Sequence, residues 1–283
     1  MKLLHVSDLH FRAHWFEWVA KQSRDYDAVC LAGDLLDMFG THRASLREQS
    51  KWVRDWLRDF PGRLFVCSGN HDWWDSDGVV DTDACCGWLD KMARPEVTID
   101  GQGADCGGYH IFCHPFRFPG IWPHAPHGKW ILLHHLPPAL AATGVSGSGG
   151  TDNGCRGLAG ALTAGPRPPR IVLSGHLHKP KSWRGLCGQT WSFNPTFDES
   201  ATVPNHIILD LKGWHGDLGD GTGRALAGSR AVSLGVLQRT LHRIVFAAGA
   251  GRGAPRSQRA AMRLSSSYRA RTRAEAASLR MGL

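Results

Sequence analysis

The sequence lacks any apolar run long enough to cross a membrane. Among its 283 residues, no stretch approaches the roughly 18–20 consecutive apolar residues that a spanning helix needs. The N-terminal segment reaches a charge at Asp8, which is too early for the apolar stretch of a signal peptide. We therefore expect a protein with no membrane span, located in the cytoplasm.

Paired cysteine motifs and nucleotide-binding loops are also missing. The chain has 8 cysteines, none of them in a C-x-x-C pair, and such scattered cysteines in a cytoplasmic protein are typical of reduced packing residues. The glycine-rich stretch 144–154 is not followed by Gly-Lys-Ser/Thr, which excludes a P-loop. It does not match G-x-S-x-G at Ser146 or Ser148, which excludes a nucleophilic serine of the hydrolase type. We expect this stretch to be a flexible loop.

Lysine is absent from the last quarter of the sequence, and this absence suggests a domain boundary. Residues 213–283 hold 12 arginines, no lysine and 3 acidic residues, a net charge of +9, whereas residues 1–212 contribute −1 to the total of +8. We expect residues 1–212 to form the folded domain. We expect 213–283 to be a basic, arginine-rich tail, partly disordered, with one amphipathic helix over 234–246. The tail either binds nucleic acid or anionic lipid, or is solvated, or was never selected to fold.

Short apolar runs, each ending in a polar cluster, recur through residues 1–212. Runs rich in Val, Ile and Leu predict buried strands, and strands that alternate with helices predict an α/β fold. The clearest helix is expected over 43–60, where Pro61 and Gly62 end it. After residue 109 only 158–162 looks helical, so we expect a more antiparallel second sheet packed on the first. Strands are expected at 3–6, 28–32, 64–67, 109–113, 130–133, 171–173, 189–193 and 207–211.

Five of these strands are followed at once by side chains that can bind metal ions. Ligands in α/β sheets bind beyond the carboxyl ends of strands. Taken singly, Asp8-Leu9-His10 and Gly33-Asp34 are typical of ordinary strand exits and turns, and Gly69-Asn70-His71-Asp72 is ambiguous. The last block, Gly175-His176-Leu177-His178, favours a metal pair, because alternation places both its imidazoles on one side of an extended segment. Together they predict a metal site. The blocks are Asp8-Leu9-His10, Gly33-Asp34, Gly69-Asn70-His71-Asp72, His134-His135 and Gly175-His176-Leu177-His178.

This order of D-x-H, G-D, G-N-H-D, H and G-H-x-H resembles the calcineurin-like metallophosphoesterase superfamily over about residues 1–212. The resemblance implies a two-layered mixed β-sandwich flanked by helices, which holds two divalent metal ions. It implies His134 rather than His135 as a ligand, because the family's ligand usually comes first, before a short run with proline. One metal would take Asp8, His10 and His178, the other would take Asn70, His134 and His176, and Asp34 would bridge both.

The chemistry agrees with these residue types. Bridging two cations needs an anionic oxygen, which Asp34 supplies. Mixed imidazole and carboxylate ligands suit Mn²⁺, the expected metal, and also Fe or Zn, better than Ca or Mg. Two such ions about 3.5–4 Å apart lower the pKa of a shared water and clamp a phosphate. By the same resemblance His71 either protonates the leaving group or stabilises the charge of the transition state, while Asp72 holds its imidazole.

The resemblance implies a phosphoester substrate but leaves its identity open. We expect a small-molecule phosphodiesterase or phosphatase, for example one acting on cyclic nucleotides. The alternative is a metal-dependent nuclease acting on DNA or RNA, which is less favoured because residues 1–212 lack the positive charge that phosphate tracking needs. A Ser/Thr protein phosphatase is disfavoured, since Asp34 is not followed by Arg-Gly and the third block ends in Asp72 rather than Glu. A scaffold without metals is excluded because every ligand position is filled.

Other residues near these blocks have two interpretations. Trp73 and Trp74 either stack on a base or pack beneath their loop. His42 and Arg43 either contact phosphate or begin a solvated helix. A third metal at His114, His124 and His127 is not favoured, because no cysteine or acidic residue lies between them. Asn194-Pro195-Thr196 departs from the Asn-Pro-Gly of many relatives, which affects the turn there and not the metal ligands. The oligomeric state is not indicated.

Overall fold

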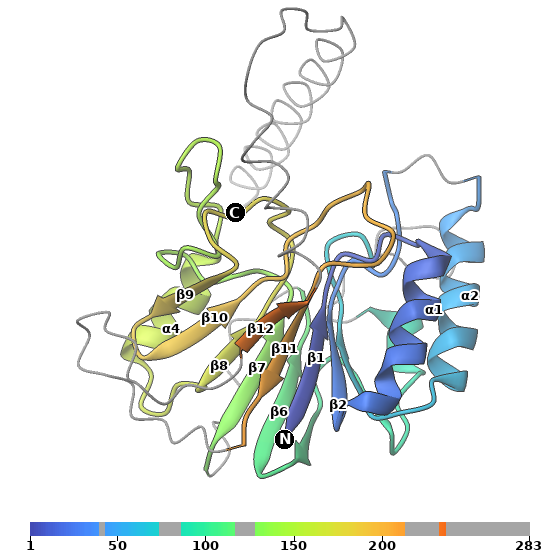
Figure 1. Cartoon of the computed structure of the whole chain (residues 1–283), viewed down its shortest axis with the longest axis horizontal. Helices are drawn as coiled ribbons and strands as arrows, with labels where there is room; N and C mark the ends of the chain where they lie inside the picture. Colours follow the sequence, from blue (N-terminus) through green and yellow to red (C-terminus); the bar gives the residue numbers. More distant parts are fainter. Residues whose placement is uncertain (40–42, 74–85, 117–127, 213–231, 236–283) are drawn as a thin grey trace, which may run out of the picture. The chain divides into compact units, whose positions relative to one another are not determined.

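The computed structural model describes residues 1–39, 43–73, 86–116, 128–212 and 232–235 (Figure 1). The chain divides into two compact units, Met1–Gln238 and Arg239–Leu283, and all described residues belong to the first. No helix among them is long and apolar enough to cross a membrane.

The first sheet holds six strands in the order β12-β11-β1-β2-β3-β4. Three parallel pairs join β1 (Lys2–Val6), β2 (Ala28–Ala32), β3 (Leu64–Cys67) and β4 (Val97–Thr98). Two antiparallel pairs add β11 (His206–Asp210) beside β1, and β12 (Val232–Gly235) beside β11. The helices of this half are α1 (Ala13–Gln22), η1 (Ser23–Asp25), α2 (Leu46–Asp59) and α3 (Gly87–Asp90).

The second sheet also holds six strands, in the order β5-β6-β7-β8-β10-β9. Its three parallel pairs join β6 (Tyr109–His114), β7 (Trp130–His134), β8 (Ile171–Leu173) and β10 (Thr190–Phe193). Its antiparallel pairs are those of the edge strands, β5 (Gly103–Cys106) and β9 (Arg184–Cys187). Helix α4 spans Arg156–Ala164.

The expectation of a more antiparallel second sheet is therefore wrong. Both sheets contain three parallel and two antiparallel pairs among the described strands. The connections after β6 and after β7 are long enough to return the chain to the starting edge, as a parallel pair requires. One helix, α4, lies in the connection after β7. Few helical patterns in this half of the sequence therefore do not predict antiparallel strands, because a parallel crossover needs length above all.

Three apolar clusters show how the layers pack. One joins α1 and α2 to the outer face of the first sheet, one lies between the sheets, and one joins α4 to the outer face of the second. Figure 1 shows α1 and α2 side by side next to β1 and β2. Successive residues of one strand point into different clusters: Leu133 of β7 lies between the sheets and Leu132 faces α4. The expected two-layered mixed sandwich flanked by helices is confirmed.

Helix α2 begins at Leu46 rather than at the expected residue 43. Ser45 accepts the N–H of Glu48, and the Glu48 carboxylate accepts the N–H of Ser45, which together form a capping box. The buried residues Val53 and Leu57 then face the first sheet. The cap thus fixes where the helix starts.

Strand β12 lies beyond Lys212, where the sequence analysis ends the folded domain. It pairs with β11 from His206↔Gly235 to Leu209↔Val232. Leu234 is therefore in a strand and not at the start of the helix expected there. The rest of that helix and the arginine-rich segment lie outside the described residues.

Candidate metal centre

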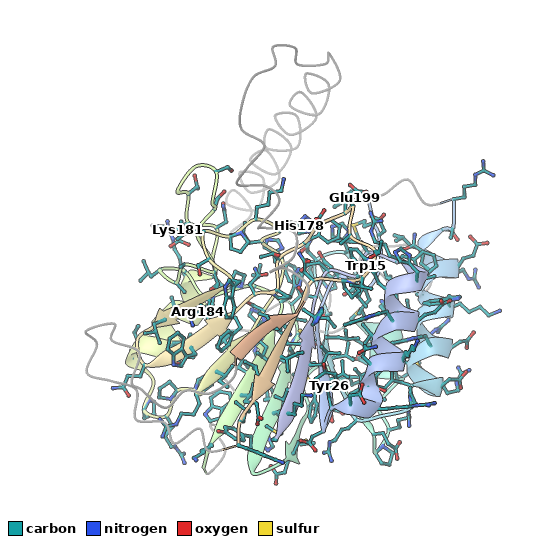
Figure 2. The ribbon with its side chains drawn as sticks, in the orientation of Figure 1. Trp15, Tyr26, His178, Lys181, Arg184 and Glu199 are labelled. Atoms are coloured by element: carbon teal, nitrogen blue, oxygen red, sulfur yellow. The ribbon has the colours of Figure 1, made fainter. Side chains whose placement is uncertain are left out.

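The predicted blocks lie at the ends of five strands and in the loops that follow them, and His134 is itself the last residue of β7. Asp8 follows β1, Asp34 follows β2 and Asn70 follows β3 in the first sheet, while the two histidine blocks lie at the ends of β7 and β8 in the second. Figure 2 shows His178 near the carboxyl ends of the strands, and Tyr26 toward the opposite end. Parallel strands end at the same edge of a sheet, and this brings the blocks together.

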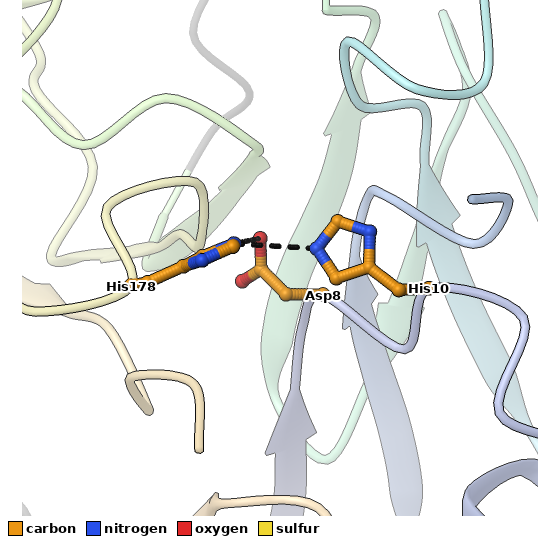
Figure 3. A group of neighbouring side chains, drawn as sticks. All are labelled: Asp8, His10 and His178. Atoms are coloured by element: carbon orange, nitrogen blue, oxygen red, sulfur yellow. Dashed lines mark hydrogen bonds and ion pairs between the residues drawn. The ribbon is translucent and has the colours of Figure 1, made fainter. Parts of the chain in front are cut away.

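Asp8, His10 and His178 form the first group of side chains (Figure 3). His10 Nε2 lies 3.2 Å from His178 Nε2, and His178 Nε2 lies 3.6 Å from Asp8 Oδ1. One ligand atom from each residue falls within 4.8 Å of the others. Two imidazole nitrogens that point at each other beside a carboxylate converge on one place, as ligands of a cation do.

Asn70, His135 and His176 form the second group. Asn70 Oδ1 lies 2.8 Å from His176 Nδ1 and 3.0 Å from His135 Nε2. The two imidazoles pack edge to face, with ring centroids 5.1 Å apart. The amide oxygen follows a strand of the first sheet, and the two ring nitrogens follow strands of the second, so the group joins the two sheets.

Asp34 lies between the two groups and is 2% exposed. Its Oδ2 is 3.9 Å from His10 Nε2, and its Oδ1 is 3.3 Å from His135 Nε2. Burial by itself would raise the pKa of Asp34, but the charges and hydrogen bond of neighbouring imidazoles, His135 first, hold it well below its usual value. The carboxylate is ionised and presents one oxygen to each group.

The structure brings His135, and not the expected His134, to this position. His135 Nδ1 donates to the Ala32 carbonyl at 2.6 Å, and this bond aims Nε2 at Asp34. His134 is on the opposite face of β7, where its ring meets His114 with centroids 5.0 Å apart. His134 Nδ1 is buried and has no hydrogen-bond partner among the described residues. The resemblance pointed to the first histidine of the pair, but the alternation of β7 selects the second.

Several of these residues have strained backbones. Asp8, Asp34 and His176 adopt positive φ angles of 55°, 53° and 66°, in a region that non-glycine residues rarely enter. Gly33 has a φ of 75°, and a Cβ there would lie 2.6 Å from His135 Nδ1. Such outliers persist where surrounding structure enforces them, and they cluster at functional sites.

The sequence matches the family model of the calcineurin-like phosphoesterases over residues 1–180. The chain belongs to this family. It is a phosphoester hydrolase of a metal-dependent family, so the coarse functional expectation is confirmed. No curated protein matches the sequence.

Solved structures are similar to this phosphoesterase at low identity. TT1561 of Thermus thermophilus is 15% identical with a TM-score of 0.50, over 75% of this chain and 94% of that one. An archaeal phosphodiesterase is 16% identical with a TM-score of 0.40, over 75% and 94%. YfcE, a phosphoesterase from E. coli, is 17% identical with a TM-score of 0.37, over 74% and 88%. The similarity to TT1561 supports the fold of this chain and says nothing about its substrate.

Asp72 does not hold the imidazole of His71 in this phosphoesterase, contrary to expectation. Its Oδ1 accepts the main-chain N–H groups of Leu35 and Leu36 at 2.8 and 2.9 Å, and its Oδ2 accepts that of Gly69 at 2.8 Å. Burial raises the pKa of the carboxyl, and these N–H groups oppose the rise. Asp72 thus ties the loop after β2 to the loop after β3.

His71 is oriented instead by the main chain. Its Nδ1 accepts the N–H of Met38 at 3.1 Å, so the neutral ring carries its proton on Nε2. Nε2 lies 3.8 Å from Asp34 Oδ2, beside the predicted metals. This neutral tautomer is suited to donating a hydrogen bond from Nε2 to a phosphoryl or leaving oxygen.

Asn194 holds the loop that carries His176 and His178, a function that the sequence analysis missed. Its Nδ2 donates to the carbonyls of Gly175 at 2.8 Å and Leu177 at 3.1 Å, and the side chain is fully buried. The sequence showed only the unusual turn Asn-Pro-Thr. No sequence pattern reveals which carbonyls a buried amide reaches.

The residues present fit a pair of cations. Burial lowers the pKa of His10, and lowers that of His176 to about 4, so both rings are neutral with free lone pairs. Burial opposes protonation of His135 too, but Asp34 raises its pKa to about 9, so this ring must lose a proton when it binds metal. The eight side chains that gather here are Asp8, His10, Asp34, Asn70, His71, His135, His176 and His178.

Other expected contacts are only partly described. Trp73 packs near Phe116, with ring centroids 6.4 Å apart, and Arg43 is exposed. Trp74, His42, His124 and His127 lie outside the described residues, so both alternatives for Trp74 and for His42 stay open, and the expectation of no third metal is not tested.

Proposed function

We propose that this phosphoesterase uses two divalent metal ions to hydrolyse small-molecule phosphodiesters or phosphomonoesters. Asp8, His10 and His178 hold one ion, and Asn70, His135 and His176 hold the other. Asp34 bridges the two. Mn²⁺ is the proposed native metal, with Fe or Zn as alternatives, because imidazole and carboxylate ligands suit these ions.

The position of Asp34 carries the proposal. One of its oxygens faces His10 and the other faces His135, an arrangement that suits a carboxylate bridging through both oxygens. When bound, such a pair of ions supplies a water of lowered pKa and positive charge for the phosphate. The chain itself contributes the fixed geometry of the ligands, because loops from both sheets are cross-linked there. His176 N–H, for example, donates to Asp8 Oδ1 at 3.1 Å.

His71 acts on the leaving side in this proposal. Its Nε2–H is held near Asp34 by the Met38 bond to Nδ1. A hydrogen bond from Nε2 stabilises negative charge that develops on a phosphoryl or leaving oxygen. Asp72 is a positioning residue that fixes the two loops and makes no contact with the reacting group.

The centre is accessible from solvent, which supports small diesters as substrates. The side chain of His178 is 41% exposed, whereas that of Asp8 is 1% exposed. The ion at this group would therefore be reached from the His178 side. Residues 1–212 carry a net charge of −1, so nothing in the described part of the chain favours nucleic acid over a small substrate.

The test is a metal-loaded activity screen of the full chain. Its substrates are bis-p-nitrophenyl phosphate, p-nitrophenyl phosphate, cyclic AMP and single-stranded DNA, each with Mn²⁺, Fe²⁺ or Zn²⁺, and Asp34→Asn serves as the matched control. We expect cleavage of the small esters and none by the variant. Cleavage of DNA alone would replace the proposal with the nuclease alternative, and no cleavage of any ester with any metal would reject both.

A further inference from the structure

We infer that Phe39 is a platform for the leaving group, and that the substrate therefore carries a planar aromatic or heteroaromatic group there, as aryl and base-bearing esters do. The inference rests on the proposed function, because it assigns a substrate class to the same site. Phe39 is 69% exposed. Its ring centroid lies 5.0 Å from that of His71, with the ring planes 82° apart.

Phe39 differs from the other phenylalanines that pack against this centre. The ring centroid of Phe197 lies 4.4 Å from that of His178, and the ring centroid of Phe116 lies 5.9 Å from that of His135. Both are partly buried, and Phe197 also packs on His10 and Trp15, so these rings pack against the imidazoles as part of the protein interior. Phe39 contacts His71 but leaves most of its ring in solvent, where apolar surface is unfavourable.

The main chain fixes Phe39 relative to His71. The preceding residue, Met38, donates its N–H to His71 Nδ1 at 3.1 Å. One short segment therefore orients the imidazole and presents the phenyl ring beside it. A change in the position of this segment would move both groups together.

The position of the leaving oxygen determines which part of the substrate lies against Phe39. A leaving oxygen that accepts the Nε2–H of His71 holds its substituent beside the imidazole, and Phe39 contacts that imidazole with ring centroids 5.0 Å apart. A flat substituent can stack on this ring or meet its edge, and aromatic pairs gain roughly 0.5–1.5 kcal/mol beyond the area they bury, or about two- to tenfold in affinity. A saturated substituent of equal size gains the buried area but not this preference.

The test compares two ligands that differ chiefly in this property. Phenylphosphonate and cyclohexylphosphonate have the same carbon number, neither is hydrolysed, and both are dianions when binding is measured above the second pKa of each. Their dissociation constants are measured by calorimetry on the full, metal-loaded chain and on Phe39→Leu, Phe39→Tyr and Leu186→Ala. Leu186 is an exposed apolar residue on β9, 43% exposed, and its variant controls for the loss of surface apolar area.

We expect the wild type to bind phenylphosphonate about two- to tenfold tighter than its saturated partner. Phe39→Leu should lose this preference, while Phe39→Tyr and Leu186→Ala should keep it. A preference that survives in Phe39→Leu, or that is missing from the wild type, overturns the inference even when both ligands bind and esters are cleaved. A chain that binds neither ligand and cleaves no ester rejects the proposed function and this inference with it.

Discussion

His135 Nε2 lies 3.3 Å from Asp34 Oδ1, and this contact separates two adjacent histidines into different roles. The strand before them is buried on both faces, with Leu133 between the sheets and Leu132 beneath α4. His135 continues the inner face and reaches the centre. His134 continues the outer face and packs against His114.

Alanine at position 135 should therefore weaken metal binding, whereas alanine at position 134 should not. His135→Ala should lose one metal ion per chain and reduce activity by at least about 100-fold, because ligands fix both affinity and geometry. His134→Ala is the matched control: it removes a neighbouring imidazole of equal size and should keep the metal content. Elemental analysis of the purified variants measures both. Loss of a metal from His134→Ala alone would restore the original assignment.

The sequence was a good guide to the strands and a poor guide to this choice. Polar blocks after buried runs located the carboxyl ends of β1, β2, β3, β7 and β8. Because β7 is apolar on both faces, its pattern has no alternation from which the inner face can be deduced. The partners of Asp72 were hidden for another reason: they are main-chain N–H groups, and those of Leu35 and Leu36 lie far back along the chain. The sequence shows only that Asp72 follows His71.

Asp34→Asn should abolish the pairing of metal ions. A bridging carboxylate offsets the repulsion of two close cations, and an amide cannot do so. Elemental analysis of active wild-type protein should find two transition metals per chain, and the variant at most one, with activity on bis-p-nitrophenyl phosphate lower by at least about 100-fold. At most one metal in fully active wild type would contradict the dinuclear proposal.

His71→Ala should affect poor leaving groups more than good ones. A hydrogen bond from the neutral Nε2–H contributes roughly 10²–10³-fold where the leaving oxygen develops strong negative charge, and p-nitrophenolate scarcely needs it. The measurement is kcat on an alkyl ester and on the p-nitrophenyl ester of the same phosphate. His71→Gln, which keeps an amide donor, serves as a partial rescue. Equal losses on both esters would place the action of His71 on the phosphate or the metals.

Acid should destabilise the metal-free protein through buried histidines, of which His5 is the clearest. His5 is fully buried between the sheets, with Nε2 at 2.9 Å from the Ser174 carbonyl. Burial lowers its pKa from 6.5 to about 4, so between these values the unfolded chain binds a proton that the folded chain does not. His5 therefore leaves the free energy of unfolding unchanged above about pH 6.5 and lowers it as the pH falls toward 4, by roughly 3 kcal/mol at most.

Urea unfolding of the metal-free protein at pH 7, 6 and 5 measures this dependence. His5→Gln does not titrate and keeps an amide N–H for Ser174, so its stability should fall less steeply with acid than that of the wild type. His14→Gln, at an exposed position of α1, is the control and should follow the wild type. Parallel curves for the wild type and His5→Gln would assign the acid sensitivity to other groups.

Two truncated chains, ending at Lys212 and at Gln238, should separate the metal centre from the C-terminal segment. Every proposed ligand precedes Lys179, so we expect both to bind two metals and to cleave small diesters. The shorter chain loses β12, which leaves β11 as an unpaired edge. Since each main-chain hydrogen bond contributes about 0.5–1.5 kcal/mol net, we expect it to be less stable by roughly 1–3 kcal/mol. The longer chain should match the full protein in urea unfolding.

The outcomes distinguish three views of the segment after Lys212. If the shorter chain is insoluble or inactive while the longer one works, β12 completes the domain and the predicted boundary at residue 212 is wrong. If both fail, residues after Gln238 contribute to folding. If both cleave small diesters but only the full chain cleaves DNA, its arginines, which account for the net charge of +9 over residues 213–283, bind nucleic acid, and the nuclease alternative becomes the better account of the function.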